Sequence, residues 1–164
     1  MTLIDRYDED QWSESISEDI ANGLIFAEKY SAPGFRAAIN NHVQSEWDAG
    51  LSEVIDVRAV QDMASRMMGK VPQERVFWQF LVDECCSTTS EYSMGPEYEE
   101  EAEEKMPKEF LLRCMRRFRE LVKTPQQGKE QERCYLEHWS AKEKNACSGL
   151  HMRYDEATRH GYFE

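Results

Sequence analysis

The chain has 164 residues, 40% of them hydrophobic, and a formal net charge of −12 at pH 7. This length suits one compact domain with a tail, and the apolar content is enough for a modest core. The acidic balance argues against nucleic-acid binding, which needs an excess of Lys and Arg. The sequence shows no signal-peptide pattern and no apolar run of about 18 residues. We therefore expect a protein of the cytoplasm or nucleus that does not contact membranes.

The first predicted helix occupies the region around residues 16–27, where apolar residues recur at steps of three and four. Ser15 and Glu18 have the spacing of a capping box, which places the helix start there. Pro33 disfavours helical geometry in the preceding residue, so we expect this helix to end near Ala32.

A second helix should follow Pro33 and pack against the first as a hairpin. Its expected inner face contains Phe35, Ala38, Ile39, His42, Val43 and Trp47. Its expected outer, exposed face contains Arg36, Asn40 and Gln44. The position of His42 among apolar residues favours a core or boundary histidine over a ligand or a general base.

Three further helices are predicted downstream. Residues 56–68 align Val57, Val60, Ala64 and Met67 on one face. Residues 72–86 align Val76, Phe77, Phe80, Leu81 and Cys85. The helix after Pro107 is expected to turn five residues inward: Phe110, Leu111, Cys114, Phe118 and Leu121. No His lies near Cys85 and Cys86 in the sequence, so buried thiols explain this pair better than a nucleophile.

These patterns predict a mainly α fold: a bundle of about five to six helices with an acidic linker and a helical C-terminal tail. The expected organisation is a helical region at 13–88, an acidic linker at 89–106, and a helix plus a Cys/His-containing tail at 107–164. The linker contains the run EYEEEAEE. We expect the basic residues Arg113, Arg116, Arg117 and Arg119 to face this run, in preference to a nucleic acid.

Two segments resemble a known family. The stretch GLIFAEKYSAPGFRAAINNHV (23–43) resembles the segment that closes the BTB/POZ domain in fungal BTB proteins. The matching residues are Leu24, Ala27, Lys29, Tyr30, Pro33, Phe35 and Ala38. The stretch VPQERVFWQFLVDECC (71–86) is similar to the next helix of those proteins. The strand-containing N-terminal portion of a BTB domain has no counterpart here, so the resemblance implies a truncated or diverged member.

The resemblance also implies a function. BTB proteins are interaction modules without catalytic residues, and some dimerise or serve as substrate receptors of cullin ubiquitin ligases. We therefore expect a non-enzymatic adaptor whose partner is a protein, either a second copy of itself or a cullin-type ligase. The alternative is a small helical zinc-dependent or thiol enzyme that uses the C-terminal Cys and His residues.

The tail contains two Cys-x-x-x-His pairs, Cys134 with His138 and Cys147 with His151. Residues four apart share a helix face, so each pair could supply two ligands to a tetrahedral zinc ion. The eight-residue spacer WSAKEKNA is long enough for the chain to turn back. The alternative is an amphipathic helical tail without metal, in which Gly149 caps a helix. A zinc ion here would be structural, and no other cofactor is expected.

Overall fold

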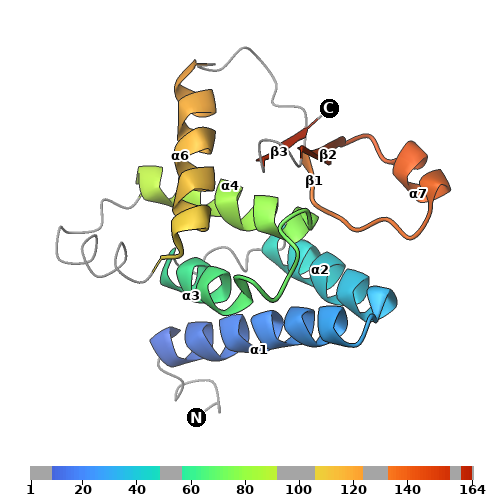
Figure 1. Cartoon of the computed structure of the whole chain (residues 1–164), viewed down its shortest axis with the longest axis horizontal. Helices are drawn as coiled ribbons and strands as arrows, with labels where there is room; N and C mark the ends of the chain where they lie inside the picture. Colours follow the sequence, from blue (N-terminus) through green and yellow to red (C-terminus); the bar gives the residue numbers. More distant parts are fainter. Residues whose placement is uncertain (1–8, 49–56, 92–105, 124–132, 156–159, 164) are drawn as a thin grey trace, which may run out of the picture.

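The computed structural model describes residues 9–48, 57–91, 106–123, 133–155 and 160–163. Five long helices in these residues pack together (Figure 1). They are α1 (Glu9–Lys29), α2 (Pro33–Asp48), α3 (Val57–Met67), α4 (Val76–Glu91) and α6 (Lys108–Lys123). α1 packs against α2 and α3, α3 against α4, and α4 against α6. The prediction of a mainly α bundle is confirmed. The acidic linker lies largely outside the described residues.

The corner between α1 and α2 follows the sequence closely. α1 ends at Lys29, and the amide of Ala32 donates to the carbonyl of Ala27 at 2.8 Å. Pro33 is the first residue of α2, where its missing N–H costs nothing. The predicted helix end is therefore confirmed. The predicted start is wrong: α1 begins at Glu9, so Ser15 lies inside the helix and does not cap it.

The core lies between α1, α3 and α4. The predicted inner faces of α3 and α4 are confirmed, since the following residues are buried: Val60, Ala64, Met67, Phe77, Phe80, Leu81 and Cys85. Trp78 is also fully buried, and its indole N–H donates to the carbonyl of Val71 at 3.3 Å. Cys85 and Cys86 are buried as expected, and all five cysteines of the chain are free thiols. None of the described helices has the length and apolarity needed to cross a membrane.

The predicted faces of α2 are only partly correct: Val43 is buried and Ile39 packs against the core as expected, but other positions differ. Phe35 is 48% exposed, and the His42 side chain is 72% exposed. Asn40 and Gln44, which we expected outside, are buried, and Arg36 is mostly covered. The sequence did not indicate that the C-terminal segment covers part of this helix, where it binds Asn40 and Arg36.

The inner face of α6 is narrower than predicted. Phe110 and Cys114 are buried, whereas Phe118 and Leu121 are exposed. Two of the basic residues of this helix bind other elements: Arg117 pairs with Asp83 of α4, and Arg113 is buried and donates to the carbonyl of Gln73. The expected pairing with the acidic run EYEEEAEE involves residues outside the described part of the chain.

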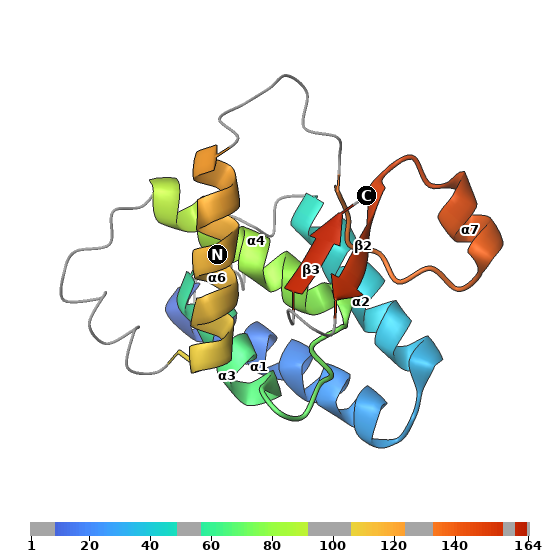
Figure 2. The ribbon, with the colours of Figure 1, turned by 45° about the horizontal axis from the view of Figure 1, so that its top comes forward.

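The C-terminal segment is not a helical tail. It contains β1 (Arg133–Cys134), the short helix α7 (Ala141–Ala146), β2 (Leu150–Asp155) and β3 (His160–Phe163). The strands form a sheet in the order β1-β2-β3, with β1 parallel to β2 and β2 antiparallel to β3. This small sheet lies beside α2 and α4, with α7 at the edge of the molecule (Figure 2).

The burial of α4 and α2 residues can be tested by comparing one substitution at a buried position with one at an exposed position. Leu81→Asp places an unpaired charge in the core and should destabilise the fold by more than about 4 kcal/mol. Phe35→Asp changes an exposed side chain and should shift the stability by no more than about 1 kcal/mol. Urea unfolding followed by circular dichroism measures both. A stable Leu81→Asp variant would show that the α4 core is assigned incorrectly.

Candidate metal centre

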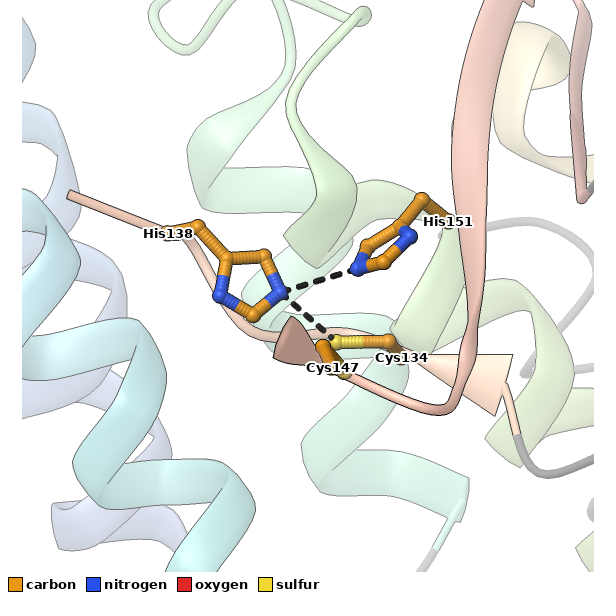
Figure 3. Close-up of side chains that lie close together, drawn as sticks. All are labelled: Cys134, His138, Cys147 and His151. Carbon is orange, nitrogen blue, oxygen red and sulfur yellow. Dashed lines mark hydrogen bonds between the residues drawn. The ribbon is translucent and has the colours of Figure 1, made fainter. Parts of the chain in front are cut away.

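Four side chains separated in the sequence converge at the edge of the small sheet: Cys134, His138, Cys147 and His151 (Figure 3). The parallel pairing of β1 with β2 places Cys134 directly opposite His151. The pairing register thus brings the first and last of the four residues together. His138 lies in the loop after β1, so the predicted helical pairing of Cys134 with His138 is wrong, although the two side chains do meet.

The short helix α7 returns the chain to the site. The Ser140 hydroxyl caps its start by accepting from the amide of Glu143 at 3.2 Å. Cys147 is the C-cap, and its own amide donates to the carbonyls of Glu143 and Lys144. The helix therefore ends at the residue that must face the other three. The expectation that the spacer turns back is confirmed.

The ligand atoms of the four residues all lie within 4.8 Å of one another. Nε2 of His138 is 3.2 Å from Sγ of Cys134 and 3.1 Å from Nε2 of His151. The two imidazole rings meet edge to face, with centroids 4.9 Å apart. A neutral imidazole nitrogen offers either one proton or one lone pair, so ordinary hydrogen bonding serves only one of these contacts well. A metal ion could accept a lone pair from each of the four atoms.

The surroundings of Cys134 and His151 favour the neutral forms of these two groups. Burial raises the pKa of the Cys134 thiol, and the nearby Cys147 thiol adds to the rise. Burial lowers the pKa of His151, and the positive charges of His138 and Lys144 lower it further. Neutral imidazole is the form that binds a metal, whereas a thiol must lose its proton first. Metal binding here would therefore release protons.

Polar residues of α2 fix the loop that carries His138. The side-chain amide of Asn41 accepts from the amide of Glu137 at 2.9 Å and donates to the carbonyl of Glu137 at 3.2 Å. Asn40 donates to the carbonyl of Tyr135 at 2.8 Å. Nε of Arg36 donates to the Glu137 carboxylate at 2.8 Å. The two asparagines therefore satisfy the carbonyl of Tyr135 and both backbone groups of Glu137, and Arg36 binds the Glu137 side chain.

Asp83 of α4 fixes the other side of the loop. Its carboxylate accepts from Arg133 at 2.8 Å and from the Tyr135 hydroxyl at 2.6 Å, and it also pairs with Arg117. Tyr135 packs its ring edge-on against Phe80, with centroids 5.6 Å apart. Cys134 thus lies between two residues that are held by one carboxylate.

The sequence pattern indicates the four possible ligands but none of the residues that position them. Asn40, Asn41 and Asp83 have no motif that marks them. The adjacent asparagines on α2 were the available signal, because two such residues are unfavourable in a helix interior unless their side chains bind something.

A cavity of about 300 Å³, open to solvent, adjoins the four-residue group. Its lining includes His138 and His151 together with Glu74, Arg75 and Lys144. Arg75 is already engaged, because its guanidinium pairs with the Glu28 carboxylate at 2.6 Å. The cavity therefore offers the two imidazoles and a set of charged side chains.

No protein-family model, no curated protein and no solved structure matches this chain. The BTB/POZ resemblance of residues 23–43 and 71–86 stays a prediction that rests on those residues alone.

The contact between α2 and the loop can be tested directly. Asn41→Ala removes both hydrogen bonds to Glu137, each worth about 1 kcal/mol. The Glu137 amide should then exchange with deuterium at least about fivefold faster, while α4 amides keep their protection. Asn22→Ala, a change at an exposed position of α1, is the matched control. Unchanged exchange at Glu137 in Asn41→Ala would show that the loop is held by other contacts.

Proposed function

We propose that the chain is a non-enzymatic protein-interaction module whose C-terminal segment folds around a structural zinc ion. The observation that carries this proposal is the convergence of two thiols and two imidazoles, which is a complete tetrahedral zinc ligand set. Four protein ligands leave no coordination position for water or substrate. Such a closed set stabilises structure and does not catalyse.

The distances suit this metal. Two nitrogen ligands of a tetrahedral zinc ion lie about 3.3 Å apart, since each Zn–N bond is about 2.0–2.1 Å. The two Nε2 atoms here are 3.1 Å apart. Two thiolates and two neutral imidazoles also balance the charge of a divalent ion.

The C-terminal segment lacks a core of its own. Cys134 is the one buried hydrophobic residue found within 133–152. Helix α7 buries none of its residues. A segment that buries so little apolar surface needs another source of stability, and metal coordination is a common one in small folds. The zinc we propose would supply it.

The interaction role is supported by an exposed aromatic cluster at the α1–α2 corner, made of Phe26, Tyr30 and Phe35. Phe26 contacts Tyr30 with ring centroids 4.5 Å apart and Phe35 at 5.9 Å. All three rings are roughly half exposed or more. Trp139, in the loop beyond His138, is 63% exposed and lies against Gly34, where an added Cβ would be 3.2 Å from its ring. Exposed aromatic residues in a group are typical of protein-binding surfaces. The partner would be a second copy or, as the BTB resemblance implies, a cullin-type ligase.

One observation favours a different function. The cavity beside His138 and His151 could admit a small molecule, as a zinc-dependent or thiol enzyme would require. Such an enzyme would need one ligand to leave the metal, or a free and reactive Cys134. Cys134 is buried, and reactive cysteines are usually accessible. We therefore place the enzyme second.

Zinc content tests the metal site. Protein purified without chelator should carry about one zinc per chain. Cys134→Ser and His138→Ala should each lose it, because a three-ligand site binds more weakly. His42→Ala, at an exposed histidine outside the site, should retain it. Elemental analysis measures the metal, and deuterium exchange should show residues 133–152 opening while the helices stay protected.

Metal-free protein with an equally protected C-terminal segment would refute the zinc proposal. Rapid alkylation of Cys134 in the zinc-loaded protein, together with turnover of a small molecule that His138→Ala abolishes, would favour the enzyme instead.

Substitutions in the aromatic cluster of Phe26, Tyr30 and Phe35 test the proposed partner-binding surface. A double change, Phe26→Ser with Tyr30→Ser, should weaken capture of the physiological protein partner at least about tenfold, because clustered aromatic residues dominate binding energy. Asn22→Ser, at a nearby exposed position, should have no effect. Affinity capture from an extract of the source cells, followed by quantitative mass spectrometry, compares the three proteins. Equal recovery of the same partner by all of them would place the binding surface elsewhere.

A further inference from the structure

Helix α6 carries a second apolar surface that the bundle does not cover. Leu112, Met115, Phe118 and Leu121 follow one another at steps of three, and each is between 37% and 52% exposed. Residues three apart are neighbours on a helix, but each such step falls about 60° short of a full turn. Leu112, Met115 and Phe118 therefore form the apolar stripe on the outer side of α6, whereas Leu121, seven residues after the buried Cys114, lies towards the covered side. Phe110 and Cys114 face α4 instead, where they are buried. α6 crosses α4 at the outside of the bundle (Figures 1 and 2).

Basic residues accompany this stripe. α6 contains six basic and two acidic residues, within a chain whose net charge is −12. Lys108, Arg116 and Arg119 are exposed. Lys108 lies four residues before Leu112, and Arg119 lies four after Met115, so each shares a helix face with an exposed apolar side chain. The Glu120 carboxylate lies 3.5 Å from the guanidinium nitrogen of Arg117. Arg113 and Arg117 point inward, and the acidic Glu109 and Glu120 are exposed. Lys108, Met115 and Arg119 lie on one side of the helix, and the two acidic residues lie about a quarter turn away from it. The side of α6 that carries Met115 is therefore apolar and basic together.

Apolar and basic residues on the same side of α6 favour some binding partners over others. A second copy placed on the stripe by two-fold symmetry would bring the basic face of α6 against itself. An anionic membrane would meet the stripe and also the acidic remainder of the protein, because a bilayer is flat and extends beyond α6. A single helix about 10 Å wide touches the stripe alone. Charges further away are screened, because the Debye length is about 8 Å at physiological salt.

We propose that the α6 stripe binds an amphipathic helix of another protein, with an apolar face and Asp or Glu residues on its flanks. The apolar face would cover Met115 and Phe118, and the acidic flank would pair with Arg119 and Lys108. This inference rests on the proposed role as an interaction module but uses a surface separate from the cluster of Phe26, Tyr30 and Phe35. The two proposals can be tested independently, because different substitutions change the two surfaces.

The probe is a synthetic amphipathic helix of about 20 residues, with Leu on one face and Glu on the flanks, and the control peptide has Lys in place of each Glu. Fluorescence anisotropy with the full chain should show at least about tenfold tighter binding of the Glu peptide. Phe118→Ser and Arg119→Glu should each weaken this binding about tenfold, equivalent to about 1.4 kcal/mol. Added salt should weaken it further. Tyr30→Ser and Lys29→Glu, which change an exposed aromatic and an exposed basic residue at the C-terminal end of α1, should leave it unchanged.

Equal affinity for both peptides, or full binding by Phe118→Ser, would overturn the proposal. So would three other results, each of which identifies a different occupant. Binding to phosphatidylserine vesicles that Arg119→Glu abolishes would indicate a membrane. A dimer in sedimentation analysis that Phe118→Ser dissociates would indicate a second copy. Peptide binding that appears only after Glu99, Glu100 and Glu101 are changed to Gln would indicate the chain's own acidic segment.

Discussion

The Asp83 carboxylate is the contact on which the arrangement of the C-terminal segment depends. It lies on α4, is 10% exposed, and binds Arg117 of α6, Arg133 of β1 and the hydroxyl of Tyr135. A buried carboxylate is tolerated only when its charge is paired, so these partners stabilise one another's positions. Asp83 thus joins α6 and β1 to the core helix, and the residue between Arg133 and Tyr135 is Cys134, the first residue of the candidate metal centre.

The opposite side of that centre depends on α2. Asn40, Asn41 and Arg36 bind the chain from Tyr135 to Glu137, immediately before His138. Cys134 and His138 are therefore positioned from two different helices. Metal sites usually depend on such supporting contacts, which set the orientation of the ligands. The support from the bundle holds one half of the site, whereas Cys147 and His151 depend on the turn through α7 and on the pairing of β1 with β2.

The sequence predicted the helices and the core well, because large apolar residues such as Phe77, Leu81 and Met67 show their spacing directly. It was only partly correct on α2, where the buried face contains Asn40 and Gln44. Polar residues are assigned to the surface by default, and Asn40 is instead bound to the backbone of a segment 95 residues further along. The strands were missed because β1 has two residues and β3 four, too few for an alternating pattern. The four possible ligands were found because Cys and His are rare in this chain and occur together in the tail.

The molecule uses different forces in its two regions. The bundle buries large side chains such as Trp78 and Phe80 and is stable through apolar contact. The segment from Arg133 to Met152 buries almost none and relies on polar contacts and, as we propose, on zinc. Coordination energy is delivered only when the ligands meet, so metal binding and folding of this segment would be coupled. Trp139 lies one residue beyond His138 and against Gly34 of α2. The position of its ring against Gly34, the residue before Phe35, would then depend on the metal, which links the structural site to the α1–α2 corner proposed for partner binding.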